Sequence, residues 1–204
     1  ANYLLSNHKK QSSQYYYDKY IGVGKAPNLN KGYWVVMQHP VTNELEDAKS
    51  QIFKTFDAVR FLNEPVIWFW PNVDAGSDIV SNALRTLRES HELKNFHFFK
   101  NMNSKDFLSL LLYSNGLIGN SSVGIRECSY LSIPSINIGT RQNKRIRGFN
   151  VIDVPHDKQL IIDAATSIIK QKRPKKSKIY GEGNSGEKIA NILSDVPLIY
   201  HKTI

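Results

Sequence analysis

Short apolar runs recur along this 204-residue chain, and a longer stretch with helical spacing follows most of them. The runs predict buried strands at 33–37, 66–70, 96–99, 116–119, 134–138 and 150–153. Apolar side chains three and four positions apart predict helices at 44–63, 77–91, 104–113, 121–131, 156–171 and 185–194. Strands that alternate with helices indicate an α/β fold with a doubly wound parallel sheet of Rossmann type, covered by helices on both faces.

The first 32 residues follow a different pattern, polar and rich in tyrosine. Positions 3–20 predict one amphipathic helix, which Gly22, Gly24 and Pro27 then break. We therefore divide the chain into a helical or irregular N-terminal segment, 1–32, and a Rossmann-like domain, 33–204.

Composition narrows the class of protein. With 41% hydrophobic and 22% charged residues, the chain can build a core of its own. Its one cysteine, Cys128, excludes an internal disulfide framework and a cysteine-based zinc site, and favours a reducing compartment. No signal peptide and no membrane-spanning run is visible, so we expect a cytoplasmic protein without a membrane partner. Because the chain begins at Ala1, we expect a trimmed chain or a fragment.

The formal net charge of +9 raises the possibility of a nucleic-acid partner. One basic run, 170–178, surrounds Pro174 between two predicted helices, and we interpret it as a solvated loop. A second run, 141–147, directly follows a predicted strand, which favours contact with a ligand. Aromatic residues are not interleaved with either run, so we do not favour nucleic acid.

Polar and glycine-containing loops follow four of the predicted strands, at 38–44, 71–77, 120–127 and 139–142. Parallel α/β sheets bind ligands at the carboxyl ends of their strands. A small anionic ligand is the simplest common cause of these loops.

Ser121, Ser122 and Gly124 open a predicted helix directly after an apolar strand. Free N–H groups at a helix start, the helix dipole and serine hydroxyls together favour a phosphate or diphosphate. Two structural alternatives stay open: a serine that only caps the helix, and Gly124 chosen for packing of helix on strand. The stretch matches neither the dinucleotide fingerprint nor the P-loop.

Glu127, Arg141 and Gln142 are further candidates near this stretch. A carboxylate beyond a phosphate cradle can accept both ribose hydroxyls, and an arginine after a strand can pair with a phosphate. The alternatives are an exposed helix glutamate and a surface arginine.

His39 and Asn72 also follow predicted strands, and either can reach a sugar or serve only as a structural or turn residue. Asp74 has the same two interpretations. We find no metal-ligand spacing and no nucleophile elbow, and we expect no metal and no cofactor.

Taken together, these loops resemble a known family. The stretches 38–42, 70–77, 118–127, 134–142, 150–151 and 178–184 are similar to those of the hydrolysing UDP-N-acetylglucosamine 2-epimerases of sialic-acid and related nonulosonate biosynthesis. The resemblance runs from about residue 33 to residue 194 and keeps the order of the motifs.

The resemblance implies an enzyme of glycosyltransferase-B type, in which two Rossmann-like domains face each other across a cleft. The C-terminal domain holds the nucleotide, and the N-terminal domain supplies most acid/base carboxylates. UDP-N-acetylglucosamine, or a related diacetamido sugar, reacts with water to give the free 2-epimer and UDP. This chain resembles the C-terminal half alone, with 33–204 as its nucleotide-binding domain. We expect it to need its N-terminal partner domain for turnover.

The resemblance also implies roles for single residues. His39 is the expected catalytic residue at the sugar. The residues expected to bind substrate lie on strand-end loops or flank them: Asn72, Phe107, Ser121, Ser122, Gly124, Glu127, Arg141 and Gln142. Within this set, Phe107 flanks the uracil, Glu127 holds the ribose and Asn72 reaches the sugar. The diphosphate is held by Ser121, Ser122 and Gly124, with Arg141 on the phosphate side.

Two other functions stay open at this level. Non-hydrolysing 2-epimerases carry a different His-Arg-Arg loop and a different loop after the fifth strand, so we favour the hydrolysing branch. A non-catalytic module that binds nucleotide anions is the second alternative. The sequence leaves the sugar and a homo-oligomeric state undecided.

Overall fold

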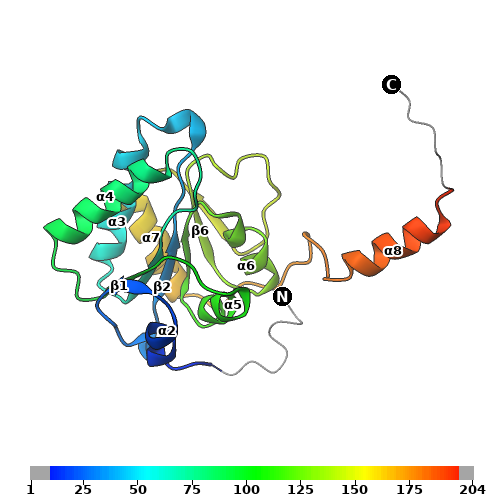
Figure 1. Cartoon of the computed structure of the whole chain (residues 1–204), viewed down its shortest axis with the longest axis horizontal. Coiled ribbons are helices and arrows are strands. Elements are labelled where there is room, and N and C mark those ends of the chain that lie inside the picture. Colours follow the sequence, from blue (N-terminus) through cyan, green and yellow to red (C-terminus); the bar gives the residue numbers. More distant parts are fainter. Residues whose placement is uncertain (1–9, 198–204) are drawn as a thin grey trace.

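The computed structural model describes residues 10–197, which are built around one seven-stranded sheet (Figure 1). The strands lie in the order β1-β4-β3-β2-β5-β6-β7, and all neighbours are parallel except β1 and β4. Their bounds are β1 Gly22–Gly24, β2 Trp34–Met37, β3 Val66–Phe69, β4 Phe96–Phe99, β5 Gly116–Gly119, β6 Ser135–Ile138 and β7 Val151–Val154. The doubly wound sheet predicted from the sequence is confirmed.

Helices cover both faces of the sheet because the side chains of each strand alternate between the faces. On one face Trp34, Val36 and Trp68 pack in a buried cluster with residues from α3 (Ala48–Phe61), α4 (Ser77–Ser90) and α7 (Lys158–Ile169). On the other face Val35 and Ile67 pack in a second cluster with residues from α2 (Ser13–Lys19), α5 (Ser104–Leu112) and α6 (Glu127–Tyr130).

The strand order reverses at the centre of the sheet. The chain begins its parallel strands at β2 and adds β3 and β4 on one side, then returns to add β5, β6 and β7 on the other. The loops after β2 and β5 therefore diverge from adjacent strands, which is where open α/β sheets bind their ligands.

The N-terminal segment differs from its prediction in two ways. Within the described residues the helix covers only Ser13–Lys19, because Ser12 caps its start and Tyr20 is already extended; residues 3–9 of the predicted helix lie outside the described range. Gly22 and Gly24 do not simply break the chain, since they belong to β1, which pairs antiparallel with β4 at the sheet edge. Pairing with a distant strand leaves little local signal in three residues.

One buried carboxylate ties this segment to the domain. Asp106, at the start of α5, accepts hydrogen bonds from Lys19 at 2.8 Å, Tyr20 at 2.6 Å and Tyr15 at 3.0 Å. Burial alone raises the pKa of Asp106, but the bonds from Lys19, Tyr20 and Tyr15 outweigh it and lower the pKa overall. Residues 13–20 are thus fixed against α5.

The helix predicted at 121–131 is wrong as a single element. The structure has a 3₁₀ turn, Ser122–Gly124, followed by the short helix α6, Glu127–Tyr130. Asn150 donates to the Gly124 carbonyl at 2.9 Å and so occupies an acceptor that a continuous helix would use. The helix predicted at 44–63 is confirmed as α3, but it begins only at Ala48 and ends at Phe61, and a 3₁₀ turn, Thr42–Glu44, precedes it.

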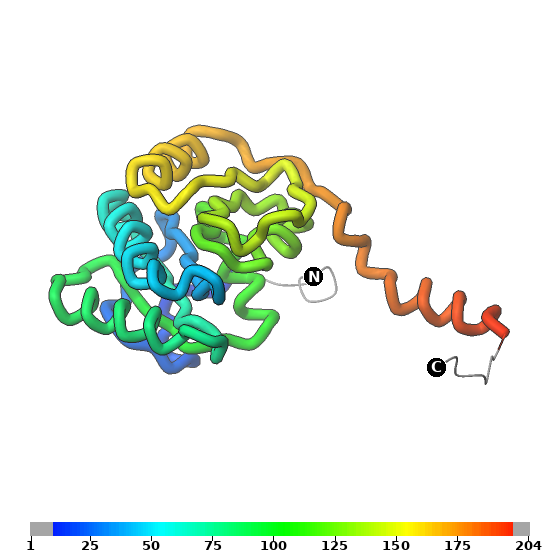
Figure 2. Tube along the Cα trace, turned by 90° about the horizontal axis from the view of Figure 1, so that it is seen from above, coloured from blue at the N-terminus to red at the C-terminus, as the bar shows by residue number. Residues whose placement is uncertain are grey.

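The C-terminal part leaves the body of the domain, and α8 (Ser185–Asp195) stands clear of it with no buried residue (Figure 2). The basic run before it is not wholly the solvated loop that the sequence predicted. Arg173 Nη2 donates to the carbonyl of Ser114 at 2.6 Å and anchors the run to the domain. Across residues 10–197, no helix has the length and apolar character needed to cross a bilayer.

Candidate functional site

The loops after β2, β5 and β6 meet at the point where the strand order reverses, and Asn120 joins them. Its Oδ1 accepts the His39 N–H at 2.7 Å, and its Nδ2 donates to the His39 carbonyl at 2.8 Å. Its own carbonyl accepts from Arg141 at 3.2 Å and Gln142 at 2.8 Å. Asn120 is fully buried, and sequence reasoning gave it no role.

His39 is buried next to this junction. The pKa of its imidazole is lowered to about 4, mainly by burial and also by the positive charge of Arg141, while Asp74 opposes the shift. The ring is therefore neutral near pH 7. Its Nδ1 atom is buried and has no hydrogen-bond partner among the described residues.

Arg141 and Gln142 lie in the loop after β6. Besides Asn120, Arg141 pairs with Asp74 at 3.8 Å, and burial lowers the pKa of its guanidinium before that carboxylate partly restores it. Gln142 is fully buried, and its Oε1 has no partner within the described part of the chain. The structure thus brings His39, Arg141 and Gln142 together around Asn120.

Ser121 and the 3₁₀ turn Ser122–Gly124 follow Asn120 directly, and we call them together the serine turn. Ser121 Oγ accepts the Val123 N–H at 3.4 Å, so this serine caps the 3₁₀ turn. Its carbonyl accepts the Gly124 N–H at 3.1 Å. Within residues 10–197, the N–H groups of Ser121 and Ser122 donate to no other protein group, which leaves them free for an anion.

Gly124 does not face an open cradle. It is buried, and a Cβ added to it would collide with Ser135 Oγ and lie 3.1 Å from Leu117 Cδ2. Its small size lets the turn pack on β5 and β6, and its N–H is already bonded. The sequence suggested that Gly124 lets a ligand approach the backbone closely, but in the structure it lets the neighbouring strands β5 and β6 approach instead.

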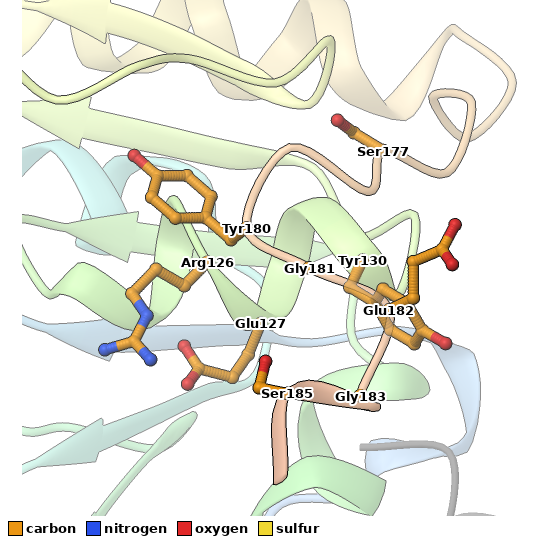
Figure 3. Close-up of a pocket in the computed structure, with 9 residues that line it drawn as sticks. All are labelled: Arg126, Glu127, Tyr130, Ser177, Tyr180, Gly181, Glu182, Gly183 and Ser185. Atoms are coloured by element: carbon orange, nitrogen blue, oxygen red, sulfur yellow. The ribbon is translucent and has the colours of Figure 1, made fainter. Parts of the chain in front are cut away.

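Glu127, the first residue of α6, faces a hollow of about 190 Å³ between α6 and the segment that leads to α8 (Figure 3). Its Oε2 atom is buried and has no hydrogen-bond partner among the described residues. The hollow is lined by Arg126, Glu127, Tyr130, Ser177, Tyr180, Gly181, Glu182, Gly183 and Ser185.

A second hollow, of about 610 Å³, lies among the loops after β2, β3 and β6. Thr140 on one side bonds to Glu44 on the other, and Glu44 also accepts from Gln51 at 2.8 Å. Thr140 and Glu44 had no predicted role; only their positions at strand ends could have signalled one. The lining is Pro40, Val41, Thr42, Asn43, Asp74, Ala75, Thr140, Arg141 and Asn143.

Two predicted residues lie apart from the Asn120 junction. Asn72 is exposed in the turn after β3, two residues before Asp74, and none of the hydrogen bonds found in residues 10–197 involves its side chain. Phe107 is half-buried in α5 and packs edge-on against Phe69, with ring centroids 5.2 Å apart. The described residues hold no group of three His, Cys, Asp or Glu side chains placed to bind a metal.

A family model described as UDP-N-acetylglucosamine 2-epimerase matches residues 4–194. Among curated proteins, the chain is 37% identical to polysialic acid biosynthesis protein P7 of Escherichia coli over 140 residues, 68% of this chain and 35% of that protein. It is 28% identical to a Legionella pneumophila UDP-N,N'-diacetylbacillosamine 2-epimerase (hydrolyzing) over 164 residues, 80% of this chain and 43% of that protein. The chain thus spans less than half the length of these relatives.

Solved structures share the fold. The Neisseria meningitidis UDP-GlcNAc 2-epimerase bound to UDP-GlcNAc gives a TM-score of 0.65 at 18% identity, over 82% of this chain and 46% of that one. The Methanocaldococcus jannaschii enzyme in complex with UDP-GlcNAc and UDP gives 0.66 at 14% identity, over 93% and 49%. Because the family model covers nearly the whole chain, the resemblance noted in the sequence is confirmed: the chain belongs to the UDP-N-acetylglucosamine 2-epimerase family.

Proposed function

We propose that this chain is the nucleotide-holding half of a hydrolysing UDP-sugar 2-epimerase. UDP binds at the carboxyl edge of the sheet, and the sugar projects toward the second hollow. In the longer protein, water and a UDP-linked 2-acetamido sugar give the free 2-epimer and UDP. The sugar is N-acetylglucosamine or a related diacetamido sugar.

The observation that carries this proposal is the Glu127 carboxylate. A buried oxygen without a partner is costly unless a ligand satisfies it. Glu127 lies three residues beyond the 3₁₀ turn Ser122–Gly124, so the same strand-end loop can supply groups for a diphosphate and for its ribose. Both ribose hydroxyls can donate to this carboxylate.

The diphosphate is assigned to the serine turn. Ser121 and Ser122 offer free N–H groups there, and Arg141 lies close enough to contact their neighbour Asn120. The 3₁₀ turn is too short to supply a large dipole, so the arginine charge and these N–H groups provide the attraction. Gly124 acts by packing and makes no direct contact in this assignment.

His39 is assigned to the sugar end. It precedes Pro40, which lines the second hollow, and its imidazole is neutral near pH 7. A neutral ring can accept or donate a proton, whereas an imidazolium ion can only donate. The carboxylates that complete the acid/base set are assigned to the other half of the longer protein.

Two observations favour the hydrolysing branch. The loops at 38–42 and 139–142 have the hydrolysing pattern and lack the His-Arg-Arg loop. Relatives from Legionella pneumophila and Campylobacter jejuni are described as hydrolyzing 2-epimerases, the latter 32% identical over 130 residues.

Titration calorimetry of the 204-residue chain tests nucleotide binding. UDP should bind, UMP should bind more weakly because it lacks the second phosphate, and GDP should bind more weakly than UDP. An oligonucleotide that binds more tightly than UDP and loses affinity steeply with salt would count against the proposal.

The branch is decided on the longer protein that contains this chain. With UDP-N-acetylglucosamine or the diacetamido analogue, NMR should show a free 2-epimeric sugar and UDP in equal amounts. A 2-epimer still linked to UDP would instead place the protein in the non-hydrolysing branch.

A further inference from the structure

The loops after β2 and β5 are held together by a single side chain. Beyond Met37 and Gly119 the paired part of these strands ends. Gly119 has φ +138, and its Cα lies so close to the Met37 carbonyl that no Cβ would fit. Past this point Asn120 still donates its backbone N–H to the Met37 carbonyl at 3.0 Å, and its side chain makes the next two bonds.

The side-chain amide of Asn120 makes the hydrogen bonds to the His39 backbone that a neighbouring strand would otherwise make. It accepts the His39 N–H and donates to the His39 carbonyl, the two bonds that a residue of a neighbouring antiparallel strand would exchange with His39. Among side chains of this length, only asparagine offers an acceptor and a donor in one plane. An aspartate carboxylate can accept from the N–H, but it repels the carbonyl oxygen.

His39 depends on this pairing for its orientation. Its Nδ1 has no hydrogen-bond partner among the described residues, so no bond at that atom fixes the ring. The backbone of His39, in contrast, is fixed on both sides by Asn120. The point from which the buried imidazole leaves the main chain is therefore set by Asn120.

The same residue reaches the loop after β6. The Asn120 carbonyl accepts from Arg141 and Gln142 at once, and Gln142 is fully buried. Arg141 carries the positive charge that the proposed site assigns to the diphosphate. Three loops from three strands thus converge on one asparagine.

We propose that Asn120 is a positioning residue, which fixes the His39 main chain with its side-chain amide and the Arg141 and Gln142 side chains with its own carbonyl. It touches no reacting atom itself. The proposal rests on the proposed function for what His39 and Arg141 do, but the geometry it assigns can be tested without any nucleotide.

The first test needs no variant. Hydrogen exchange of the 204-residue chain, followed residue by residue by NMR, should show a His39 amide protected at least 100-fold over an unstructured amide, although it lies in a loop. We call the hydrogen bonds of Asn120 with His39, Arg141 and Gln142 the clamp. Exchange of the His39 amide at the unstructured rate would overturn the clamp, whatever the chain binds.

The second test compares Asn120→Asp with Asn150→Asp. Asn150 is also a buried asparagine, hydrogen-bonded to the carbonyls of Gly124 and Ile133 and to no atom of His39. Asn120→Asp should shift the His39 ring resonances and Asn150→Asp should not. Equal shifts in both variants would show only general loosening and would overturn the proposal.

Acid provides a rescue that a merely structural role would not give. When the introduced carboxyl is protonated, it can again donate to the His39 carbonyl while its other oxygen accepts the N–H. The His39 resonances of Asn120→Asp should therefore return toward those of the wild type as the pH falls, whereas those of Asn120→Ala should not. The same pH response in both variants would overturn the clamp.

UDP affinity links the clamp to function. Asn120→Asp should weaken UDP binding at least 10-fold at pH 7.5, because its carboxylate repels the His39 carbonyl and so displaces the main chain whose Asn120 carbonyl holds Arg141. A wild-type chain that does not bind UDP would refute the proposed function, while the exchange and resonance results would still decide the clamp. UDP binding by Asn120→Asp as tight as that of the wild type would refute the link between the clamp and UDP binding.

Discussion

Gly124 and Ser135 compete for one space between the serine turn and β6: a Cβ on Gly124 would collide with Ser135 Oγ. Gly124→Ala should therefore destabilise the fold by about 1–3 kcal/mol, as overpacking does. Urea unfolding measures this directly.

Two further variants check the cause. Adding Ser135→Ala should recover part of the loss, although Leu117 Cδ2 would still lie 3.1 Å from the new atom. Gly186→Ala should leave the stability of the body unchanged, because nothing lies within 4 Å of its Cβ position. A Gly124→Ala variant as stable as the wild type would refute the packing role.

Glu127→Gln should weaken UDP binding by about 1.5–3 kcal/mol, or roughly 10- to 150-fold, because the ribose loses a charged acceptor. Calorimetry with UDP and its 2′,3′-dideoxy analogue measures it: the wild type should prefer UDP and the variant should lose most of that preference. Glu89→Gln, on the exposed end of α4, serves as the control and should bind as the wild type does. A wild type that binds both ligands equally would remove Glu127 from the ribose.

His39 should make the fold less stable in mild acid. The pKa of its imidazole is 6.5 in an unstructured peptide and about 4 in the fold, because burial penalises the charged ring. Between these values the unfolded chain binds more protons, so stability is complete above about pH 6.5 and falls as the pH drops toward 4, by up to about 3 kcal/mol.

The difference between the wild type and His39→Gln isolates this effect. Other groups, among them Asp106 and His97, also have shifted pKa values, but they titrate in both proteins. Urea midpoints measured from pH 4 to pH 8 should show the wild type losing stability faster on acidification. Parallel curves would mean that His39 titrates normally.

Arg173 should matter more than its neighbours in the basic run. Arg173→Lys keeps the charge but removes the guanidinium that reaches the buried carbonyl of Ser114, and should cost about 1 kcal/mol. Lys172→Gln and Lys175→Gln, both exposed, should stay within about 0.5 kcal/mol of the wild type. Thermal unfolding of the three variants separates an anchor from a uniformly solvated loop.

The 204-residue chain alone should release no UDP from UDP-N-acetylglucosamine. Abstraction of a C–H proton and protonation of the opposite face need at least two placed acid/base groups. Here Asp74 faces Arg141, Glu44 is bonded to Thr140 and Gln51, and Glu127 is assigned to ribose. UDP release above a heat-inactivated control, followed by a coupled assay, would contradict this division of labour between the two halves.

The sequence by itself determined the sheet, most of its helices and the edge at which polar loops gather. These depend on local periodicity: short continuous apolar runs such as 66–69 are typical of strands buried on both faces, and 77–90 keeps one apolar helical face. The candidates His39, Arg141 and Gln142 were found in the same way, because they follow strands. Chain order alone brings strand ends to one edge of a parallel sheet.

Only the tertiary structure decided what depends on distant partners. The three residues Gly22–Gly24 form a strand because they pair with β4. The predicted helix is interrupted at Gly124, whose carbonyl accepts from Asn150, 26 positions away. Gly124 packs against Ser135, and Asn120 hydrogen-bonds to His39, 81 positions away. Hydrogen bonds and close packing between residues far apart in the chain leave no periodic trace in it, so they become visible only when the fold has brought the partners together.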